Sequence, residues 1–589
     1  MAGFTVRKVK LPTPETYGPY VYSGFKPGTT ILKAGHVKSE GRRPFGCDTA
    51  YDRDSAVPMR DGVKLCTDVF RPADSEINQV PAVLLWGPYG KTGNGLLHYE
   101  NMGPHNCGVP RERVSGYHKF EGLDPAEWSE RGYAIVNIDS RGIGDSEGDA
   151  IFWGQQEAED IYDTISWINE RPWSNGSVVM AGNSWLAIAQ INFASRLKHP
   201  ALKAIAPWEG ATDIYQQSRC RGGAPQIAKF NQMIMASFAG RHSAEDMPTM
   251  TKEHPLYDDY WASKRVHVSR IDCIPVYLTA SYSSMLHGFG SFESFLTMET
   301  KDKWLRVHPY QEWHDLYRAD MNDDLQRFYD RYAKGLQNGW EETPRVRLSL
   351  LAMDGSKAKS IIERPTESYP PPGFDQQVLH LNASTFAMQE SSPKDESQVS
   401  YPSHNLSGSA DFTYTFLRAC ELSGYPLVSL HISTASAEDM DVHIQLRKLS
   451  VDGELLVHHN YPTPTPIPPQ DQTNVSTYLG GTGMLRASHR VSIEPQHYLG
   501  DQPFYRHDCS EPVPVNTVVR LEIPMWPIGM VFAAGEGIML RVSGHSKCLP
   551  ETKAMTMTEP EDHNPENGVH VVHTGGEYDS FLRIPIRYT

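Results

Sequence analysis

Ser184 ends a run of residues whose pattern suits a nucleophilic serine. The segment Ser177-Val-Val-Met-Ala-Gly-Asn-Ser184 is apolar and β-branched up to Gly182, and Trp185-Leu-Ala-Ile-Ala continues with helix formers. A strand, a sharp turn and a helix in this order raise a serine hydroxyl above the edge of a sheet, on a strained backbone that needs small neighbours. The full Gly-x-Ser-x-Gly pattern is not met, because Leu186 replaces the second glycine. We interpret Ser184 as a candidate nucleophile, with a tight structural turn as the alternative.

The elements that would position Ser184 alternate between strand and helix patterns over residues 51–210. Short apolar runs at 81–86 and 134–139 predict strands that are buried on both faces. Isoleucines at helical spacing predict an amphipathic helix over 155–169. This order predicts a parallel sheet with right-handed crossovers, continued by strands at 202–206, 274–279 and 304–307.

The remaining sequence predicts a multi-domain α/β protein. Residues 1–50, rich in Pro, Gly and Lys, are expected to form an extended arm around the body. The α/β core is expected over 51–210 and 271–342, and the irregular stretch 211–270 is expected to form a helical cap over the carboxyl ends of the strands. From 343 to 589, alternating segments separated by turns predict an all-β sandwich of the jelly-roll type.

Bulk composition excludes several classes of function. The net charge of −16 argues against nucleic acid or an anionic membrane as a partner. The sequence has no apolar run of about 18 residues, so no transmembrane helix is expected. The first residues lack the apolar core of a signal peptide. The eight cysteines are scattered without a Cys-x-x-Cys pair, which favours reduced thiols in a cytoplasmic protein without a metal site. No dinucleotide-binding pattern is present, so no cofactor is expected.

Several segments, in this order and spacing, carry a family resemblance that extends over nearly the whole chain from residue 51. With them, the sequence resembles the cocaine-esterase-like (CocE/NonD) hydrolases, which are relatives of the Xaa-Pro dipeptidyl peptidases. The resemblance implies an α/β-hydrolase core, a helical cap and a C-terminal jelly-roll domain. The segments are Val57-Pro-Met-Arg-Asp-Gly62, Gly87-Pro-Tyr-Gly-Lys91, Asp139-Ser-Arg-Gly-Ile-Gly-Asp-Ser-Glu-Gly148, Trp173-Ser-Asn-Gly176, Ser423-Gly-Tyr-Pro426 and Gly483-Met-Leu-Arg-Ala-Ser-His-Arg490.

The resemblance also implies an oxyanion hole next to Ser184. In the family, the tyrosine that matches Tyr89 donates one hydrogen bond through its hydroxyl, and the backbone N–H after the nucleophile, here that of Trp185, donates the other. Loss of one such donor typically lowers the rate by ~10²–10³. The alternative is that Tyr89 is a loop tyrosine packed on the cap.

A serine hydroxyl needs a general base, because it is a poor nucleophile at its free pKa. His308 follows the last predicted core strand, where an α/β-hydrolase carries its histidine, third in the order serine, acid, histidine. We therefore predict His308 as the base. The rival is His287, which follows the preceding strand and is expected to line the pocket instead.

The triad acid is where this sequence departs from the family. The family carries Gly-Trp-x-Asp after the seventh strand, and the matching stretch here is Ala280-Ser-Tyr-Ser283. Glu209, which ends the strand that precedes the seventh strand, is the preferred replacement for the aspartate. Glu312 or Asp315, on the histidine's own loop, could instead orient His308, or Ser283 or a water could hold the ring. Loss of the acid can cost ~10⁴ in kcat.

These residues support three hypotheses about function. The first is a serine hydrolase, without cofactor, of a small to medium ester, amide or other acyl substrate, with Trp208, Tyr215, Ser283 and His287 in its pocket. The second is a repurposed scaffold that acts as a transacylase, lyase or cyclase on a natural-product intermediate in secondary metabolism. The third is a binding protein without catalysis, which would not need Tyr89, Ser184 and His308 together. The large β region also offers a surface for a homodimer.

Overall fold

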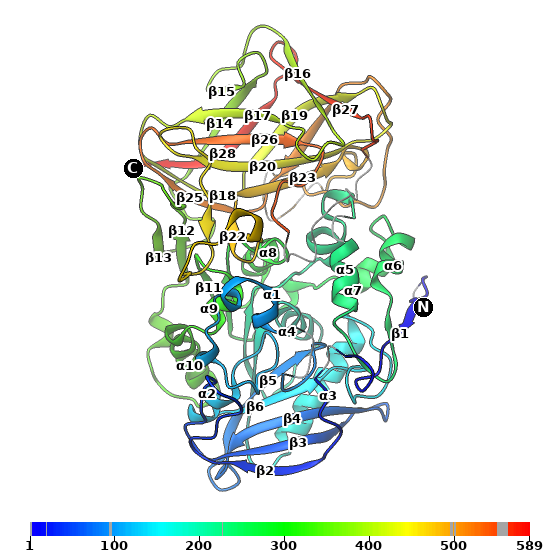
Figure 1. Cartoon of the computed structure of the whole chain (residues 1–589), viewed down its shortest axis with the longest axis vertical. Helices are drawn as coiled ribbons and strands as arrows, with labels where there is room; N and C mark the ends of the chain where they lie inside the picture. Colours follow the sequence, from blue (N-terminus) through cyan, green and yellow to red (C-terminus); the bar gives the residue numbers. More distant parts are fainter. Residues whose placement is uncertain are drawn as a thin grey trace.

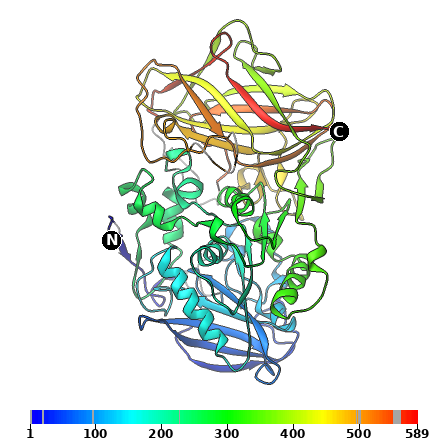
Figure 2. The same ribbon diagram turned by 180° about the vertical axis from the view of Figure 1, so that it is seen from behind.

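The chain is described from a computed structural model that covers residues 3–18, 21–93, 97–225, 228–494, 497, 499, 502–550 and 564–589. An α/β core occupies one end of the molecule and an all-β domain the other, with helices between them (Figure 1). The view from behind shows the same arrangement, with the all-β domain at one end and the α/β core at the other (Figure 2). The predicted combination of an α/β-hydrolase core, a helical cap and an all-β domain is confirmed.

The core is built on an eleven-stranded sheet in the order β13-β12-β11-β10-β8-β7-β5-β6-β4-β3-β2. The strands from β6 through β12 pair in parallel, and every residue of β5 and β6 is buried, as their continuous apolar runs predict. The six central strands are β5 (Val80–Gly87), β6 (Ala134–Asp139), β7 (Ser174–Asn183), β8 (Leu202–Trp208), β10 (Val276–Ala280) and β11 (Lys303–Val307).

Helices connect these strands and pack on the sheet. The isoleucines of α3 (Gln155–Asn169) are fully buried, as their spacing predicts, and α4 (Trp185–Arg196) is buried along nearly its whole length. The other helices of the core are α2 (Pro125–Glu130), α8 (Gly288–Thr297), α9 (Glu312–Leu316) and α10 (Ala319–Ala333).

Two expected boundaries of the core were wrong. Residues 28–32 are not part of an extended arm around the body, because they form the edge strand β2 (Gly28–Leu32) of the core sheet. This strand pairs with β3 (Thr49–Pro58), which in turn pairs with β4 (Lys64–Pro72). At the other edge, β12 (Val346–Leu350) and β13 (Ile361–Thr366) extend the core sheet past residue 342. Their alternating pattern is the same on either sheet, so the sequence could not assign them.

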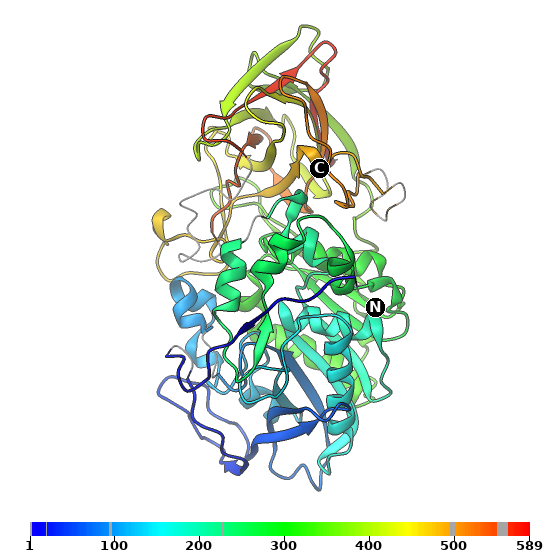
Figure 3. The ribbon, with the colours of Figure 1, turned by 90° about the vertical axis from the view of Figure 1, so that its right-hand side faces the viewer.

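The cap contains α5 (Ala228–Met235), α6 (Met247–Glu253), α7 (Asp259–Lys264) and a π-helix over Tyr215–Arg219. The N-terminal strand β1 (Lys8–Lys10) pairs with β9 (Ser243–Glu245), so the start of the chain lies against the cap. Figure 3 shows this dark-blue segment crossing the side of the molecule.

The C-terminal domain is formed by mostly antiparallel strands that belong to one thirteen-stranded sheet. Some of its strands are buried at every residue, and others alternate between buried and more exposed positions, as expected for packed β layers. The strands are β14 (Asp375–Asn382), β15 (Ala387–Gln389), β16 (Ser397–Pro402), β17 (Ala410–Thr415), β18 (Cys420–Gly424), β19 (Leu427–Thr434), β20 (Asp441–Leu449), β23 (Gly481–Arg486), β24 (Val519–Pro524), β25 (Ile528–Phe532), β26 (Gly537–Ser543), β27 (Val569–Thr574) and β28 (Phe581–Tyr588).

An ion pair buried beneath the site joins β11 to α9. The guanidinium of Arg306 and the carboxylate of Asp315 are both inaccessible to solvent, and Arg306 Nη1 donates to Asp315 Oδ2 at 2.8 Å. Burial acts to raise the pKa of Asp315, but the neighbouring cations, Arg306 foremost, hold it below its ordinary value. This pair therefore fixes the loop that carries Glu312.

Removal of one partner of this pair is expected to be strongly destabilising. Asp315→Asn should lower the free energy of unfolding by about 3–5 kcal/mol at neutral pH, because the buried Arg306 loses its fully buried counter-charge and keeps only the partly exposed Glu363. Since the folded-state pKa of Asp315 is lowered, its contribution is present above the unfolded pKa and is lost as the pH falls through the folded value. Urea unfolding at several pH values measures both effects. Asp320→Asn, which removes an exposed partner of Arg318, is the matched control and should change stability by about 0–1 kcal/mol; equal losses in the two variants would contradict the prediction.

Candidate active site

Ser184 occupies the sharp turn between β7 and α4. Its backbone has φ 57° and ψ −117°, a left-handed conformation that costs a non-glycine residue about 1–3 kcal/mol. Two backbone hydrogen bonds hold the turn: the Ser184 N–H donates to the Glu209 carbonyl at 2.9 Å, and the Asn183 N–H donates to the Glu121 carbonyl at 3.0 Å. The predicted strand, turn and helix around Ser184 are therefore present, and the turn is anchored from both sides.

Glycines accommodate the leucine that stands where the family pattern has its second glycine. A Cβ on Gly182, which has φ 114°, would lie 2.5 Å from Leu186 Cδ2, and one on Gly87 would lie 2.7 Å from Leu186 Cδ1. Both contacts are too short for any real Cβ. The bulk of Leu186 thus fills space that Gly87 and Gly182 leave open.

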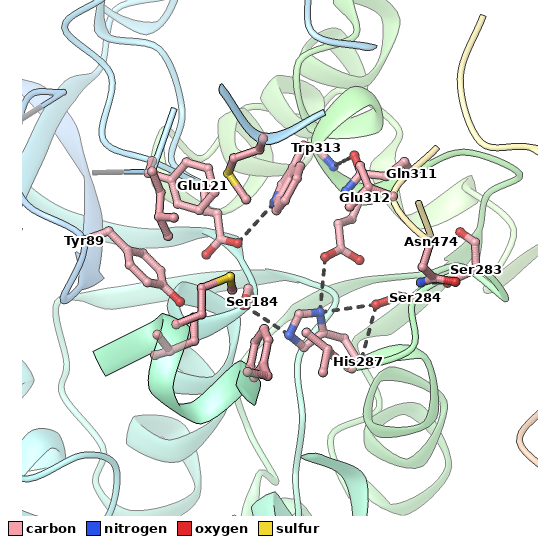
Figure 4. A pocket seen from close by; sticks show the side chains of 18 residues that line it. Tyr89, Glu121, Ser184, Ser283, Ser284, His287, Gln311, Glu312, Trp313 and Asn474 are labelled. Atoms are coloured by element: carbon pink, nitrogen blue, oxygen red, sulfur yellow. Dashed lines mark hydrogen bonds and ion pairs between the residues drawn. The ribbon is translucent and has the colours of Figure 1, made fainter. Parts of the chain in front are cut away.

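His287 is the histidine that contacts Ser184. It lies directly before α8, in the loop after β10, and its Nε2 is 3.1 Å from Ser184 Oγ. On the other side of the ring, Nδ1 is 3.2 Å from Glu312 Oε1 and 3.3 Å from Ser284 Oγ. Figure 4 shows the two contacts on opposite sides of the His287 ring, one to Ser184 and the other to Glu312. A serine, a histidine and a carboxylate in this arrangement have the geometry that a catalytic triad requires.

The assignment of His308 as the base must be corrected. His308 has no exposed surface and is absent from the lining of the pocket that contains Ser184. Its Nε2 lies 2.7 Å from Glu209 Oε1, and burial lowers its pKa to about 4. The ring is held below the site as a neutral buried imidazole. Position at the end of the last core strand selected the wrong histidine, because the loop after β10 turns His287 back over Ser184.

Glu209 does pair with His308, as predicted, but it does not contact the histidine next to Ser184. It is fully buried, with φ 57°, and its Oε2 accepts a hydrogen bond from Ser281 Oγ at 3.0 Å. Burial and the adjacent Glu312 raise the pKa of Glu209 well above its ordinary value. Two carboxyl groups in contact cannot both ionise readily, so Glu209 keeps a proton and faces Glu312 from behind. Glu209 therefore lies behind Glu312 and not next to His287.

Glu312 is the carboxylate that faces His287. Burial acts to raise its pKa, but His287 outweighs this effect, so the pKa of Glu312 is lowered. Gln311 caps the start of α9 by accepting from the N–H groups of Trp313 and His314, which fixes the turn on which Glu312 lies. Glu312 was considered from the sequence only as a partner for His308.

The predicted oxyanion donors lie next to Ser184. Tyr89 is buried, its ring packs edge-on against those of Phe120 and Trp185, and its side chain adjoins Ser184. Burial raises the pKa of Tyr89 well above its ordinary value, so the phenol keeps its proton and can donate. Trp185 is the first residue of α4, where a backbone N–H has no partner within the helix. A protonated phenol and a free helix N–H beside a serine are the kinds of donor that an oxyanion requires.

The pocket above Ser184 holds about 630 Å³ of space between atoms and is mostly apolar. Of the predicted lining residues, Ser283 and His287 are present, whereas Trp208 and Tyr215 are not and must be corrected. Trp208 is buried below the sheet edge and donates to Asp315, and Tyr215 is buried in the cap with its hydroxyl on the Pro255 carbonyl. Other lining residues are Leu97, Met102, Phe120, Glu121, Phe230, Met233, Ile234, Ser284, Leu286, Gln311, Trp313, Asn474 and Val475.

Three of these lining residues have no signal in the sequence. Asn474 and Val475 come from the C-terminal domain, and the Asn474 side-chain amide donates to the Ser283 carbonyl at 3.0 Å. Glu121 reaches the pocket from a loop of the core. A sequence pattern cannot show such contacts, because they join segments that are distant in the chain.

Within the described residues, no group of three or more His, Cys, Asp or Glu side chains is arranged to hold a metal ion. The same part of the chain contains no helix that is long and apolar enough to cross a membrane.

Comparison with known proteins places this site in a family. A sequence model of the X-Pro dipeptidyl-peptidase (S15 family) matches residues 61–251, and one of the C-terminal non-catalytic domain of X-Pro dipeptidyl-peptidase matches residues 338–583. The crystal structure of a CocE/NonD family hydrolase from Staphylococcus aureus is 30% identical, with a TM-score of 0.82 over 95% of this chain and 97% of that one. The chain belongs to the CocE/NonD family.

Other relatives are similar over less of the molecule or at lower identity. Cocaine esterase from Rhodococcus sp. (strain MB1 Bresler) is 35% identical over 374 residues, so the match spans 54% of this CocE/NonD chain and 60% of the esterase. An aminopeptidase from a marine sediment Thaumarchaeota archaeon is 17% identical, with a TM-score of 0.66 over 91% of this chain and 96% of that one, and shares the fold.

Proposed function

We propose that this chain is a serine-dependent acyl hydrolase that acts on a small to medium ester or amide through the triad Ser184, His287 and Glu312. The observation that carries the proposal is the continuous contact from Ser184 Oγ through the His287 ring to Glu312. The open, mostly apolar pocket above Ser184 supports an acyl substrate with apolar substituents. The names of the related cocaine esterase and X-Pro peptidases support ester and amide bonds as the chemical class.

The geometry supports a two-step reaction. Ser184 Oγ attacks the carbonyl carbon while His287 Nε2 takes the hydroxyl proton, and the carbonyl oxygen, now an oxyanion, accepts hydrogen bonds from Tyr89 and the Trp185 N–H. Glu312 stabilises the imidazolium, which then gives its proton to the departing alcohol or amine. A water attacks the acyl-enzyme with His287 again as the base, which releases the acid and restores Ser184.

In this triad the histidine and the acid have exchanged strands. The usual chain order is serine, acid, histidine, with the acid after the strand that corresponds to β10 and the histidine after β11. Here His287 follows β10 and Glu312 follows β11. Each replacement lies four residues beyond the expected position, since His287 follows Ser283 and Glu312 follows His308 by that number. The exchange accounts for the missing family aspartate at Ser283 without loss of the triad.

Labelling with a fluorophosphonate tests the activated serine directly. We expect the wild type to gain one phosphonyl group per chain, on Ser184 Oγ with loss of fluoride, and Ser184→Ala to gain none. Ser283→Ala is the matched control, because Ser283 lies in the same pocket but touches Ser281 and the Tyr310 carbonyl instead of a histidine. Intact-mass spectrometry measures the result, and a wild type that stays unlabelled would refute the proposed function. Cytoplasmic location and a homodimer stay predictions from the sequence.

A further inference from the structure

Glu121 is a buried carboxyl group beside Ser184 for which the triad has no use. Only 3% of the residue is exposed, and it lines the pocket. Its backbone is left-handed, with φ 65°, and is held by two hydrogen bonds: its N–H donates to the Tyr99 hydroxyl at 3.0 Å, and its carbonyl accepts from the Asn183 N–H at 3.0 Å. Since Asn183 immediately precedes the nucleophile, the position of Glu121 is tied to that of Ser184.

The two oxygens of the Glu121 carboxyl group differ. Oε1 accepts a hydrogen bond from the Trp313 indole N–H at 3.1 Å. Oε2 is buried and has no hydrogen-bond partner among the described residues. Figure 4 shows the carboxyl group pointing to the space between Tyr89 and Ser184. A buried polar atom without a partner is costly, so this oxygen is arranged for a group that arrives with the substrate.

The surroundings of Glu121 favour its protonated form. Burial raises its pKa well above the ordinary value, the negative charge of Glu312 raises it further, and the hydrogen bond from Trp313 and the nearby Ser184 hydroxyl only partly oppose this. The Trp313 N–H selects Oε1 as the carbonyl oxygen of the acid, which leaves the hydroxyl on Oε2. The titratable groups that face the site are Tyr89, Tyr99, His287, Glu312 and Tyr317, with Arg219 beyond Tyr89.

We propose that Glu121 Oε2 donates a third hydrogen bond to the carbonyl oxygen of the substrate, alongside Tyr89 and the Trp185 N–H. A tyrosine paired with a carboxylic acid that burial keeps neutral is an effective donor pair for an oxyanion. The hydrogen bond strengthens as charge develops on the oxygen, and no proton has to be transferred. This role rests on the proposed function, because it requires an oxyanion formed by attack of Ser184.

Two substitutions separate donation from mere packing. Glu121→Gln keeps the shape and a donor, since Trp313 again holds Oε1 and turns the amide N–H groups toward the substrate. Glu121→Leu fills similar space without a donor. With a neutral p-nitrophenyl acyl ester, we expect Glu121→Gln to retain kcat within about tenfold and Glu121→Leu to lose ~10²–10³ in kcat with little change in KM. Circular dichroism confirms that each variant is folded.

The pH profile gives a second readout that does not depend on the leucine variant. In the wild type, ionisation of Glu121 removes the donor and places a negative charge beside the oxyanion, so kcat should fall as the pH rises through the raised pKa of Glu121. Glu121→Gln cannot ionise and should lose this alkaline decline. The proposal is overturned if Glu121→Leu keeps the wild-type kcat, or if Glu121→Gln is as impaired as the leucine variant. It is also overturned if the glutamine variant loses activity only on substrates with a free amine, because Glu121 would then be an ammonium-binding group.

Fluorophosphonate labelling separates failure of this proposal from failure of the proposed function. A wild type that is labelled, with Glu121 variants that are kinetically unchanged, refutes only the role of Glu121. A wild type that is neither labelled nor active on esters refutes the hydrolase itself.

Discussion

Replacement of His287 by alanine is expected to lower kcat by on the order of 10⁶, while His308→Gln leaves kcat within about tenfold. The difference follows from contact: His287 Nε2 is 3.1 Å from Ser184 Oγ, whereas His308 is fully buried against Glu209. Without His287 the serine proton has no acceptor, and only the oxyanion donors and substrate binding still contribute. Steady-state hydrolysis of an acyl ester measures both variants.

Two further observations make this comparison decisive. His287→Ala should also lose fluorophosphonate labelling, and added imidazole should restore part of its activity, because a small base can enter the space that the side chain vacates. His308→Gln should instead unfold at a lower urea concentration, because His308 is packed in the core of the sheet. A folded but inactive His308→Gln, together with an active His287→Ala, would show that His308 is the base and that His287 is not.

Glu312→Gln is expected to lower kcat by ~10⁴. The amide keeps the shape of the carboxylate, but it cannot stabilise the imidazolium that forms when His287 takes the serine proton. Because the facing histidine lowers the pKa of Glu312, the wild-type acid stays ionised below the ordinary carboxyl range, so its contribution should persist into mildly acid solution. The pH dependence of kcat for the two proteins measures this.

Glu209→Gln is the matched control for Glu312→Gln, since Glu209 is an equally buried glutamate that touches Glu312 instead of His287. An amide at this position can still donate a hydrogen bond to Glu312, so we expect a loss of less than about tenfold. If Glu209→Gln were the more damaging of the two, the acid assignment would have to move to Glu209.

The features that the sequence predicts correctly are those that depend on local order. The turn around Ser184 requires a β-branched run, Gly182 and a helix former at Trp185, and all three are adjacent in the chain. Tyr89 is likewise fixed by its short loop after β5. The pairing of Glu209 with His308 could be predicted because parallel strands place their carboxyl ends at the same edge of a sheet, here the ends of β8 and β11 on either side of β10.

The features that the sequence does not predict depend on the paths of the loops after the core strands, which decide which side chains reach Ser184. His287 and His308 both follow core strands, and nothing in their neighbours shows which ring reaches Ser184. In the sequence, His287 lies four residues after Ser283, and Glu312 lies four residues after His308. These spacings identify a histidine and acid pair only once the structure shows that the two loops face each other. The absence of Trp208 and Tyr215 from the pocket reflects the same limit, because the path of the cap is set by packing between distant segments.

The wall that Asn474 and Val475 contribute to the pocket has a consequence for the newly made protein. Ser184, His287 and Glu312 leave the ribosome well before residue 474 is synthesised. Until that later segment emerges and docks against the Ser283 carbonyl, the reactive serine faces open water on one side. A nascent chain that has folded only its first half therefore holds the chemical groups without the wall that Asn474 and Val475 add to the pocket.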